Sequence, residues 1–172
     1  GSEMCIRDRN WTTQRIEEAN KFAKENGMEP IRISQINYSL AHSSVETFGD
    51  NTLVCMDTKE FRWYKKHDFP VMAFSPQAKG FFAKLAKGDA ANNLPEGQYA
   101  GPANLARLAK VKQLSEQTGD TPAKITLGYL NSQPFFVSSV FAVTKLWQLD
   151  EDMEAQDLTY DPKTVAFLEN MI

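Results

Sequence analysis

Cysteine is scarce in this chain of 172 residues. Of its two cysteines, Cys5 lies within the first nine residues and Cys55 stands alone. A scaffold of disulfides is therefore excluded, and a reducing cytoplasm is the compartment that fits best. The chain also has no apolar stretch long enough to span a bilayer, and no basic segment followed by an apolar core as in a secretory signal.

An excess of charge of one sign is also absent. The chain has 19 basic and 22 acidic residues, a net charge of −3 and no run of like charge. This balance gives no reason to expect nucleic acid or a membrane as a partner. With 42% hydrophobic residues, the composition is that of an ordinary globular protein.

Familiar catalytic motifs are missing as well. The sequence has no G-x-S-x-G, no P-loop and no cluster of residues spaced as metal ligands. Its two histidines, His42 and His67, have no partner at the spacing of a nucleophile or carboxylate, which favours surface positions. We therefore predict no catalytic residue and no metal site within this chain.

The most informative stretch that is present runs from Val71 to Phe82 and reads VMAFSPQAKGFF. Its first four residues are continuously apolar, as in a parallel strand covered on both faces. A hydroxyl at Ser75, a cation at Lys79 and a flexible Gly80 follow, at the carboxyl end of the strand, where ligands collect in α/β folds. The alternative is an ordinary exit from a strand into a loop.

Two further segments, Ile31 to Tyr38 and Phe135 to Val140, have the same strand character, and each follows a plausible helix. The pattern predicts repeated helix-strand units of an α/β fold. A helix after the last strand places Leu146, Leu149 and Met153 on one face. Expected helices cover 12–26, 57–66, 103–118, 121–131, the region around 146–153 and the segment after Pro162, with long loops at 41–56 and 83–102.

Five motifs occur in the order and approximate spacing found in one family. They are NWT from Asn10, SQINYSL from Ser34, FSPQAKG from Phe74, ITLGYLNSQP from Ile125 and QLDEDMEAQDL from Gln148. Together they resemble the carboxyl-terminal half of the aldo-keto reductases, which are (β/α)8-barrel oxidoreductases with a nicotinamide cofactor. The resemblance implies an incomplete TIM barrel, about three strands with their helices.

The resemblance also implies which residues hold the nicotinamide. Asn10 and Gln35 match the side chains that hydrogen-bond its carboxamide, a task that suits amides because each has a donor and an acceptor. Phe74 matches the aromatic residue that stacks on the ring. The alternatives are a strand-end amide that satisfies loop backbone for Gln35, and core packing for Phe74.

For the rest of the cofactor, the resemblance places the pyrophosphate against Ser75 and the loop of Lys79, Gly80 and Phe81, and it places the adenosine near Thr144 and Gln148. The matched stretch after the last strand supplies little charge, since Ala142 and Gln148 have none and Lys145 is equally explained as a solvated side chain. We expect NADP as the cofactor, with NAD as the alternative.

The catalytic residues of the family lie before the position of Asn10, so the resemblance implies that this chain lacks them. A complete (β/α)8 barrel takes about 250 residues, which also indicates an incomplete barrel. The first nine residues, GSEMCIRDR, can be back-translated to a sequence that resembles a transposon-end adapter used for sequencing libraries. We expect residues 1–9 to be foreign and 10–172 to be the partial reductase domain; the alternative is a natural arm.

Two functions follow as hypotheses. The first is the cofactor-binding half of a cytoplasmic, NAD(P)H-dependent aldo-keto reductase that acts on small aldehydes or ketones and is inactive alone. The second is a non-enzymatic α/β half-barrel that binds a nucleotide or a protein partner. The expected partners are the cofactor and a carbonyl substrate, with self-association through the unpaired strand edge. No nucleic acid or membrane partner is expected.

Overall fold

The computed structural model describes residues 6–88 and 99–169. Its centre is one sheet of four parallel strands in the order β1-β2-β3-β4. The sequence predicted three of these strands, and they are confirmed with slightly shorter bounds. The strands are β1 (Ile6–Arg9), β2 (Ile31–Asn37), β3 (Val71–Phe74) and β4 (Val137–Val140).

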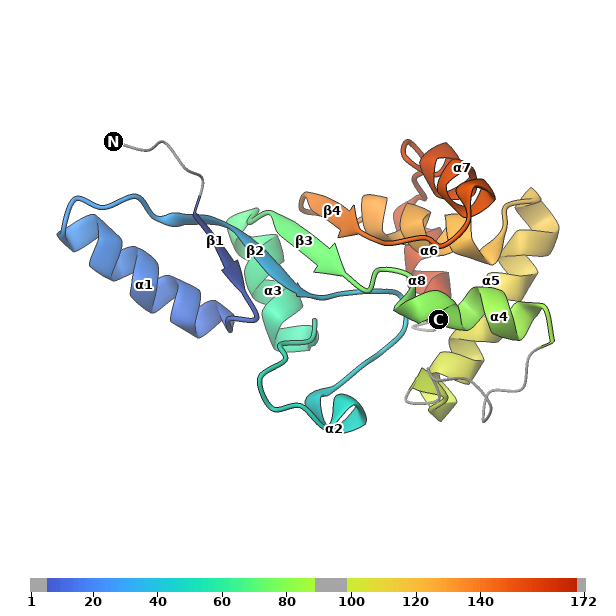
Figure 1. Cartoon of the computed structure of the whole chain (residues 1–172), viewed down its shortest axis with the longest axis horizontal. Helices are drawn as coiled ribbons and strands as arrows, with labels where there is room; N and C mark the ends of the chain where they lie inside the picture. Colours follow the sequence, from blue (N-terminus) through green and yellow to red (C-terminus); the bar gives the residue numbers. More distant parts are fainter. Residues whose placement is uncertain (1–5, 89–98, 170–172) are drawn as a thin grey trace.

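Helices cover the sheet unevenly. In Figure 1, α1 lies at one end of the molecule, while α4 to α8 gather at the other. Several begin at side-chain caps, such as Thr12 before α1, Asp57 before α3 and Thr121 before α6. The helices are α1 (Thr13–Glu25), α2 (Val45–Phe48), α3 (Thr58–His67), the 3-10 turn η1 (Ala78–Gly80), α4 (Phe81–Ala86), α5 (Pro102–Thr118), α6 (Pro122–Asn131), α7 (Leu146–Glu154) and α8 (Pro162–Leu168).

The alternation of burial along β3 explains how this strand presents a site. Val71 and Ala73 are fully buried, whereas Met72 and Phe74 are only half-buried. Successive side chains of a strand point to opposite faces, so Phe74 lies on the face away from the core. In the register, Phe74 lies beside Asn37 of β2 and Val140 of β4.

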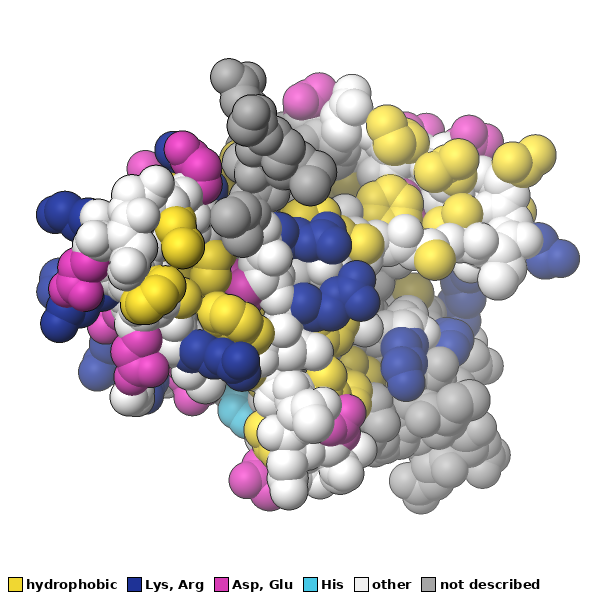
Figure 2. All heavy atoms as spheres, turned by 60° about the vertical axis from the view of Figure 1, so that its left-hand side comes forward, with side chains coloured by type: hydrophobic (Ala, Val, Ile, Leu, Met, Phe, Trp, Pro, Cys, Tyr) yellow, Lys and Arg dark blue, Asp and Glu magenta, His cyan; other side chains and the backbone are white. Residues whose placement is uncertain are grey.

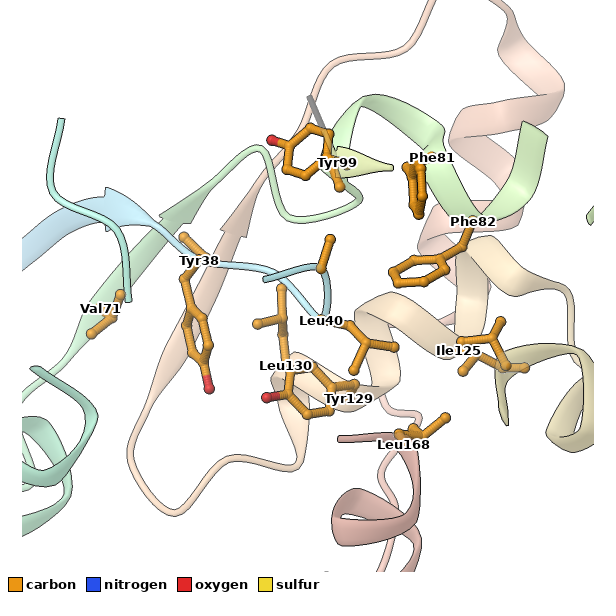
Figure 3. Close-up of a cluster of buried hydrophobic side chains, with 14 of the residues drawn as sticks. Tyr38, Leu40, Val71, Phe81, Phe82, Tyr99, Ile125, Tyr129, Leu130 and Leu168 are labelled. Carbon is orange, nitrogen blue, oxygen red and sulfur yellow. The ribbon is translucent and has the colours of Figure 1, made fainter. Parts of the chain in front are cut away.

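The core lies between β2, β3 and the helices α3, α4, α5, α6 and α8. Large buried side chains meet there, and Figure 3 shows ten of them labelled. Tyr38 packs edge-on against Tyr129 and stacks with Phe135, with ring centroids 6.4 Å apart in both pairs. Offset and edge-on aromatic packing of this kind is favourable beyond the area it buries. The core therefore fixes the carboxyl ends of β2 and β3 relative to α6.

The prediction of a loop at 83–102 was wrong for its first residues. Residues 81–86 form α4, because Phe81, Phe82 and Leu85 share a face and are buried against the core. The Gly, Ala and Asn content that indicated a loop belongs mainly to residues 89–98, which lie outside the described residues. The other predicted loop, 41–56, contains the short helix α2 and a bridge between Asn37 and Cys55.

Strand β1 belongs to the segment that the sequence analysis left out of the fold. Its four residues pair in parallel with β2, and Asp8 lies beside Ser34 in the register. The four residues of β1, IRDR, are mostly polar and have no sequence pattern typical of a strand. They form a strand because β2 provides the hydrogen-bond partners. The foreign origin of residues 1–9 stays a prediction, because pairing within the sheet says nothing about where a segment comes from. Residues 1–5 lie outside the described residues.

Asp8 is a buried carboxylate, with 4% of its surface exposed. The Ser34 hydroxyl donates to its Oδ2 at 2.9 Å, and the Tyr64 hydroxyl donates to Ser34 at the same distance. Its Oδ1 has no partner among the described residues. Burial raises the pKa of Asp8, while the bond from Ser34 opposes this change.

This raised pKa predicts a pH dependence of stability. The folded chain binds a proton at Asp8 more tightly than the unfolded chain, so the stabilising contribution is present below the unfolded pKa and is lost as pH rises through the folded pKa. We expect Asp8→Asn to narrow the difference in free energy of unfolding between acidic and neutral pH, measured by urea titration. Ser34→Ala, which removes the opposing hydrogen bond, should widen it; an unchanged profile in both variants would contradict the assignment.

The surface agrees with the absence of a dominant charge in the sequence. The face drawn in Figure 2 carries acidic and basic side chains of both signs, with hydrophobic ones between them. Within 6–88 and 99–169, the structure has no helix of the length and apolarity needed to cross a membrane.

Candidate functional site

Strained backbone concentrates where the sequence predicted a cofactor. Five non-glycine residues in the described ranges have a positive φ, and four of them are Asn10, Ser75, Ala78 and Lys79. Such conformations cost on the order of 1–3 kcal/mol each and cluster at functional sites. The fifth, Asp68, ends helix α3. The strain therefore marks two segments, the end of β1 and the exit from β3.

Asn10, which directly follows β1, lies beside Gln35 of β2. The N–H of Asn10 donates to the carbonyl of Gln35 at 2.9 Å. The side-chain oxygens Asn10 Oδ1 and Gln35 Oε1 are both buried, and neither accepts a hydrogen bond from a described residue. A buried acceptor without a donor is costly. The two amides thus have the chemistry to receive N–H groups of a ligand.

Phe74 is not part of the core. Its ring is half-buried and lies outside the cluster of buried side chains and the residues packed on it. One residue further on, the chain turns at Ser75 with a φ of 53°. Because the opposite face of β3 holds Val71 and Ala73 in the core, Phe74 presents its ring on the same face as Met72.

The segment after β3 forms a tight left-handed turn. The N–H of Ala78 donates to the carbonyl of Ser75, and the N–H of Gly80 donates to that of Gln77, both at 2.9 Å. Gly80 has a φ of 80°, which suits glycine. Turns with left-handed residues gather backbone N–H groups into concavities that bind anions.

A cleft of about 1170 Å³ opens beside this turn. Its walls are the segment 75–87 and the stretch from the end of β4 into α7, and parts of α5 and α6 also line it. Five of the residues predicted to bind the cofactor line the cleft: Ser75, Lys79, Gly80, Thr144 and Gln148. The structure therefore brings together the predicted pyrophosphate and adenosine segments.

One side-chain hydrogen bond connects the two walls of the cleft, and others fix the conformation of the second wall. Gln77 Nε2 donates to Asp152 Oδ1 at 2.6 Å across the cleft. Burial raises the pKa of Asp152, and the hydrogen bond from Gln77 opposes this change. Gln148 Oε1 accepts from the backbone N–H groups of Thr144 and Lys145, so it orders the turn into α7.

The other four predicted site residues, Asn10, Gln35, Phe74 and Phe81, do not line the cleft. Of these, Phe81 lies in the core. Its side chain is fully buried, with its ring centroid 5.2 Å from that of Phe82 and 6.0 Å from that of Tyr99. Figure 3 shows it within the hydrophobic cluster. The left-handed turn before it starts α4 with Phe81 facing the core, so only the backbone of Phe81 is available to a ligand.

A comparison with protein families decides the relationship. The model of the aldo/keto reductase family matches residues 5–172. The chain belongs to the aldo/keto reductase family. Its members are oxidoreductases, and they generally use nicotinamide cofactors. The four parallel strands and their helices make an incomplete (β/α)8 barrel.

Burial affects the pKa values of the tyrosines in this aldo/keto reductase chain. Burial raises the pKa of Tyr38, Tyr64 and Tyr129, and it raises that of Tyr160 to about 12. A tyrosine that protonates a substrate near neutral pH needs a lowered pKa. Tyr99, the fifth, is buried among Phe48 and Phe81.

The two histidines are exposed. His67 packs on Trp63, with ring centroids 4.4 Å apart, and lies 4.0 Å from Glu17 on α1. His42 lies in the loop after β2, where its backbone N–H donates to Asn104 Oδ1. Neither lines the cleft of this reductase chain.

Several residues of the cleft were not predicted from the sequence. They are Gln77, Trp147 and the lysines of α4 and α5, namely Lys84, Lys87 and Lys112. Gln77 lay within the FSPQAKG motif, so the motif was a signal for it. Trp147 directly precedes the predicted Gln148, and Lys84 and Lys87 follow the predicted Gly80 closely, but no local pattern marked these residues or Lys112 of α5.

Proposed function

We propose that this chain is the cofactor-binding part of a cytoplasmic, NADPH-dependent reductase of small aldehydes or ketones. The observation that carries the proposal is the pair of buried oxygens Asn10 Oδ1 and Gln35 Oε1, which lie on neighbouring segments of the sheet and accept no hydrogen bond from a described residue. An amide NH2 would satisfy them. The strained turn at 75–80 and the cleft beside it support the same interpretation.

Each segment has a separate task in this proposal. Asn10 and Gln35 orient the carboxamide, and Phe74 covers one face of the nicotinamide ring. The backbone of Ser75 to Gly80, with the ammonium of Lys79, holds the pyrophosphate. Thr144 and Gln148 border the adenosine. When bound, the cofactor supplies the hydride that reduces a carbonyl group.

We further propose that the 172-residue chain binds the cofactor without turnover. The raised pKa values of its buried tyrosines support this, because none is suited to donate a proton to a substrate. Binding alone is also what the second hypothesis, a nucleotide-binding module, requires. Self-association of the incomplete barrel belongs to the same proposal. The cytoplasmic location rests on Cys55, a buried free thiol.

The experiment is a calorimetric titration of the chain with NADPH, which measures the affinity. We expect Phe74→Ala to weaken binding several-fold, because it removes a stacking contact of about 1 kcal/mol beyond its buried area. Phe74→Tyr keeps the ring and should be nearly neutral. Gln35→Ala should also weaken binding, since it deletes one of the two carboxamide partners.

Phe136→Ala provides the control, because Phe136 is an exposed aromatic residue at the opposite end of β4 from the cleft. It should leave the affinity unchanged. If Phe74→Ala and Gln35→Ala fold normally and bind NADPH as tightly as the unaltered chain, the placement of the nicotinamide is wrong.

A further inference from the structure

Helix α4 provides cations to the cleft that the sequence did not connect with it. Lys84 and Lys87 are three residues apart, so they lie on one side of the helix, and both line the cleft. The side chain of Lys84 runs past the strained turn, since a Cβ on Gly80 would lie 3.5 Å from its Cε. Lys87 lies about one helical turn after Lys84, at the carboxyl end of α4.

Lys87 reaches the opposite wall. Its Nζ lies 5.4 Å from the ring centroid of Trp147, the second residue of α7. Both residues line the cleft. The indole is 54% exposed, unusually open for the largest apolar side chain. We call these two residues the Trp147–Lys87 pair.

The chemistry of the pair selects a class of ligand. An exposed aromatic face stacks on another flat ring, and an ammonium group binds phosphate as a point charge. The ligand should therefore combine an aromatic ring with a phosphate close to it. Adenosine 2′-phosphate has this combination, whereas unphosphorylated adenosine offers the ring alone.

The rest of the cleft is consistent with this division. The stretch after β4 has no cation at Ala142 or Gln148, and the carbonyl of Gln148 is occupied by backbone donors. Carboxylates of Glu116, Glu151 and Asp152 also line the cleft, and Asp152 accepts from Gln77. The lysines of the lining offset these carboxylates, and Lys87 is the lysine that lies beside Trp147.

We propose that the Trp147–Lys87 pair binds the adenosine 2′-phosphate end of NADP, with Trp147 stacked on the adenine and Lys87 paired with the 2′-phosphate. This inference rests on the proposed function. It makes the pair the determinant of NADP over NAD in this chain, with Trp147 from the stretch that follows β4 and Lys87 from the opposite wall, at the end of α4.

Calorimetry of the full chain with 2′,5′-ADP and 5′-AMP tests the proposal, because these probes differ only in the 2′-phosphate. The unaltered chain should bind 2′,5′-ADP about tenfold more tightly or better. Lys87→Met, which keeps the length of the stem, should abolish most of this preference and leave 5′-AMP within about twofold. Trp147→Ala should weaken both probes, and Trp147→Phe should restore them in part.

Lys110→Met is the matched control. Lys110 also lies over an aromatic ring, 4.4 Å from the centroid of Phe167, but it does not line the cleft. This variant should bind both probes normally. Equal affinity of the unaltered chain for the two probes, or an unchanged preference in a folded Lys87→Met chain, would overturn the proposal. Failure to bind NADPH and NADH at all would instead refute the proposed function.

Discussion

The 172-residue chain should oxidise no NADPH above a buffer blank when it is offered a panel of aldehydes and ketones. A general acid contributes roughly a hundredfold to ten-thousandfold to such a reaction. We expect no tyrosine of this chain to serve as that acid, because Tyr64 donates to Ser34, Tyr129 donates to Glu169, and burial raises the pKa of both. Binding of the cofactor should nevertheless be measurable in the same sample.

The positive counterpart is a chimera. The chain from Asn10 onward, joined to the amino-terminal half of a closely related aldo/keto reductase with Ser in place of Arg9, should reduce aldehydes. In that chimera Phe74→Ala should weaken the binding of NADPH several-fold. Turnover by the unaltered 172-residue chain would show that a group within it serves as the acid, and it would refute the inference from the tyrosines.

The sequence predicted those parts of the fold whose signals are local. The apolar run at 71–74 and the caps at Thr12 and Thr121 correspond to β3, α1 and α6. Strand β1 was not predicted, because its pairing depends on β2 and not on its own four residues. Helix α4 was taken for loop, since only three buried residues distinguish it from the Gly- and Asn-rich stretch that follows.

The candidate site divides in the same way. Ser75, Lys79 and Gly80 are contiguous, and the motif pointed to them; the structure places all three on the cleft. Phe81 follows directly in sequence, but the left-handed turn directs its ring into the core. Trp147 and Lys87 are brought together only by the packing of α4 and α7 around the cleft. No spacing in the sequence predicts that contact.

Helix α7 carries a cluster of exposed apolar side chains. Helix α7 has Leu146, Leu149 and Met153 on one face, as the sequence predicted, yet all three are exposed, Leu146 by 81%. Within the described residues, β4 pairs only with β3 and β1 pairs only with β2. Strand edges and apolar surface of this kind lead to association.

We therefore expect the purified chain to self-associate, with the edges of two parallel four-stranded sheets meeting so that eight strands close a barrel. Burial of one leucine side chain is worth about 1.5–3 kcal/mol. Replacing both Leu146 and Leu149 with Glu should then weaken association by roughly a hundredfold or more. Leu105→Glu on α5, at another exposed leucine, is the control and should change little. Sedimentation velocity across a range of concentrations measures this, and a stable monomer at every concentration would show that these surfaces do not drive assembly.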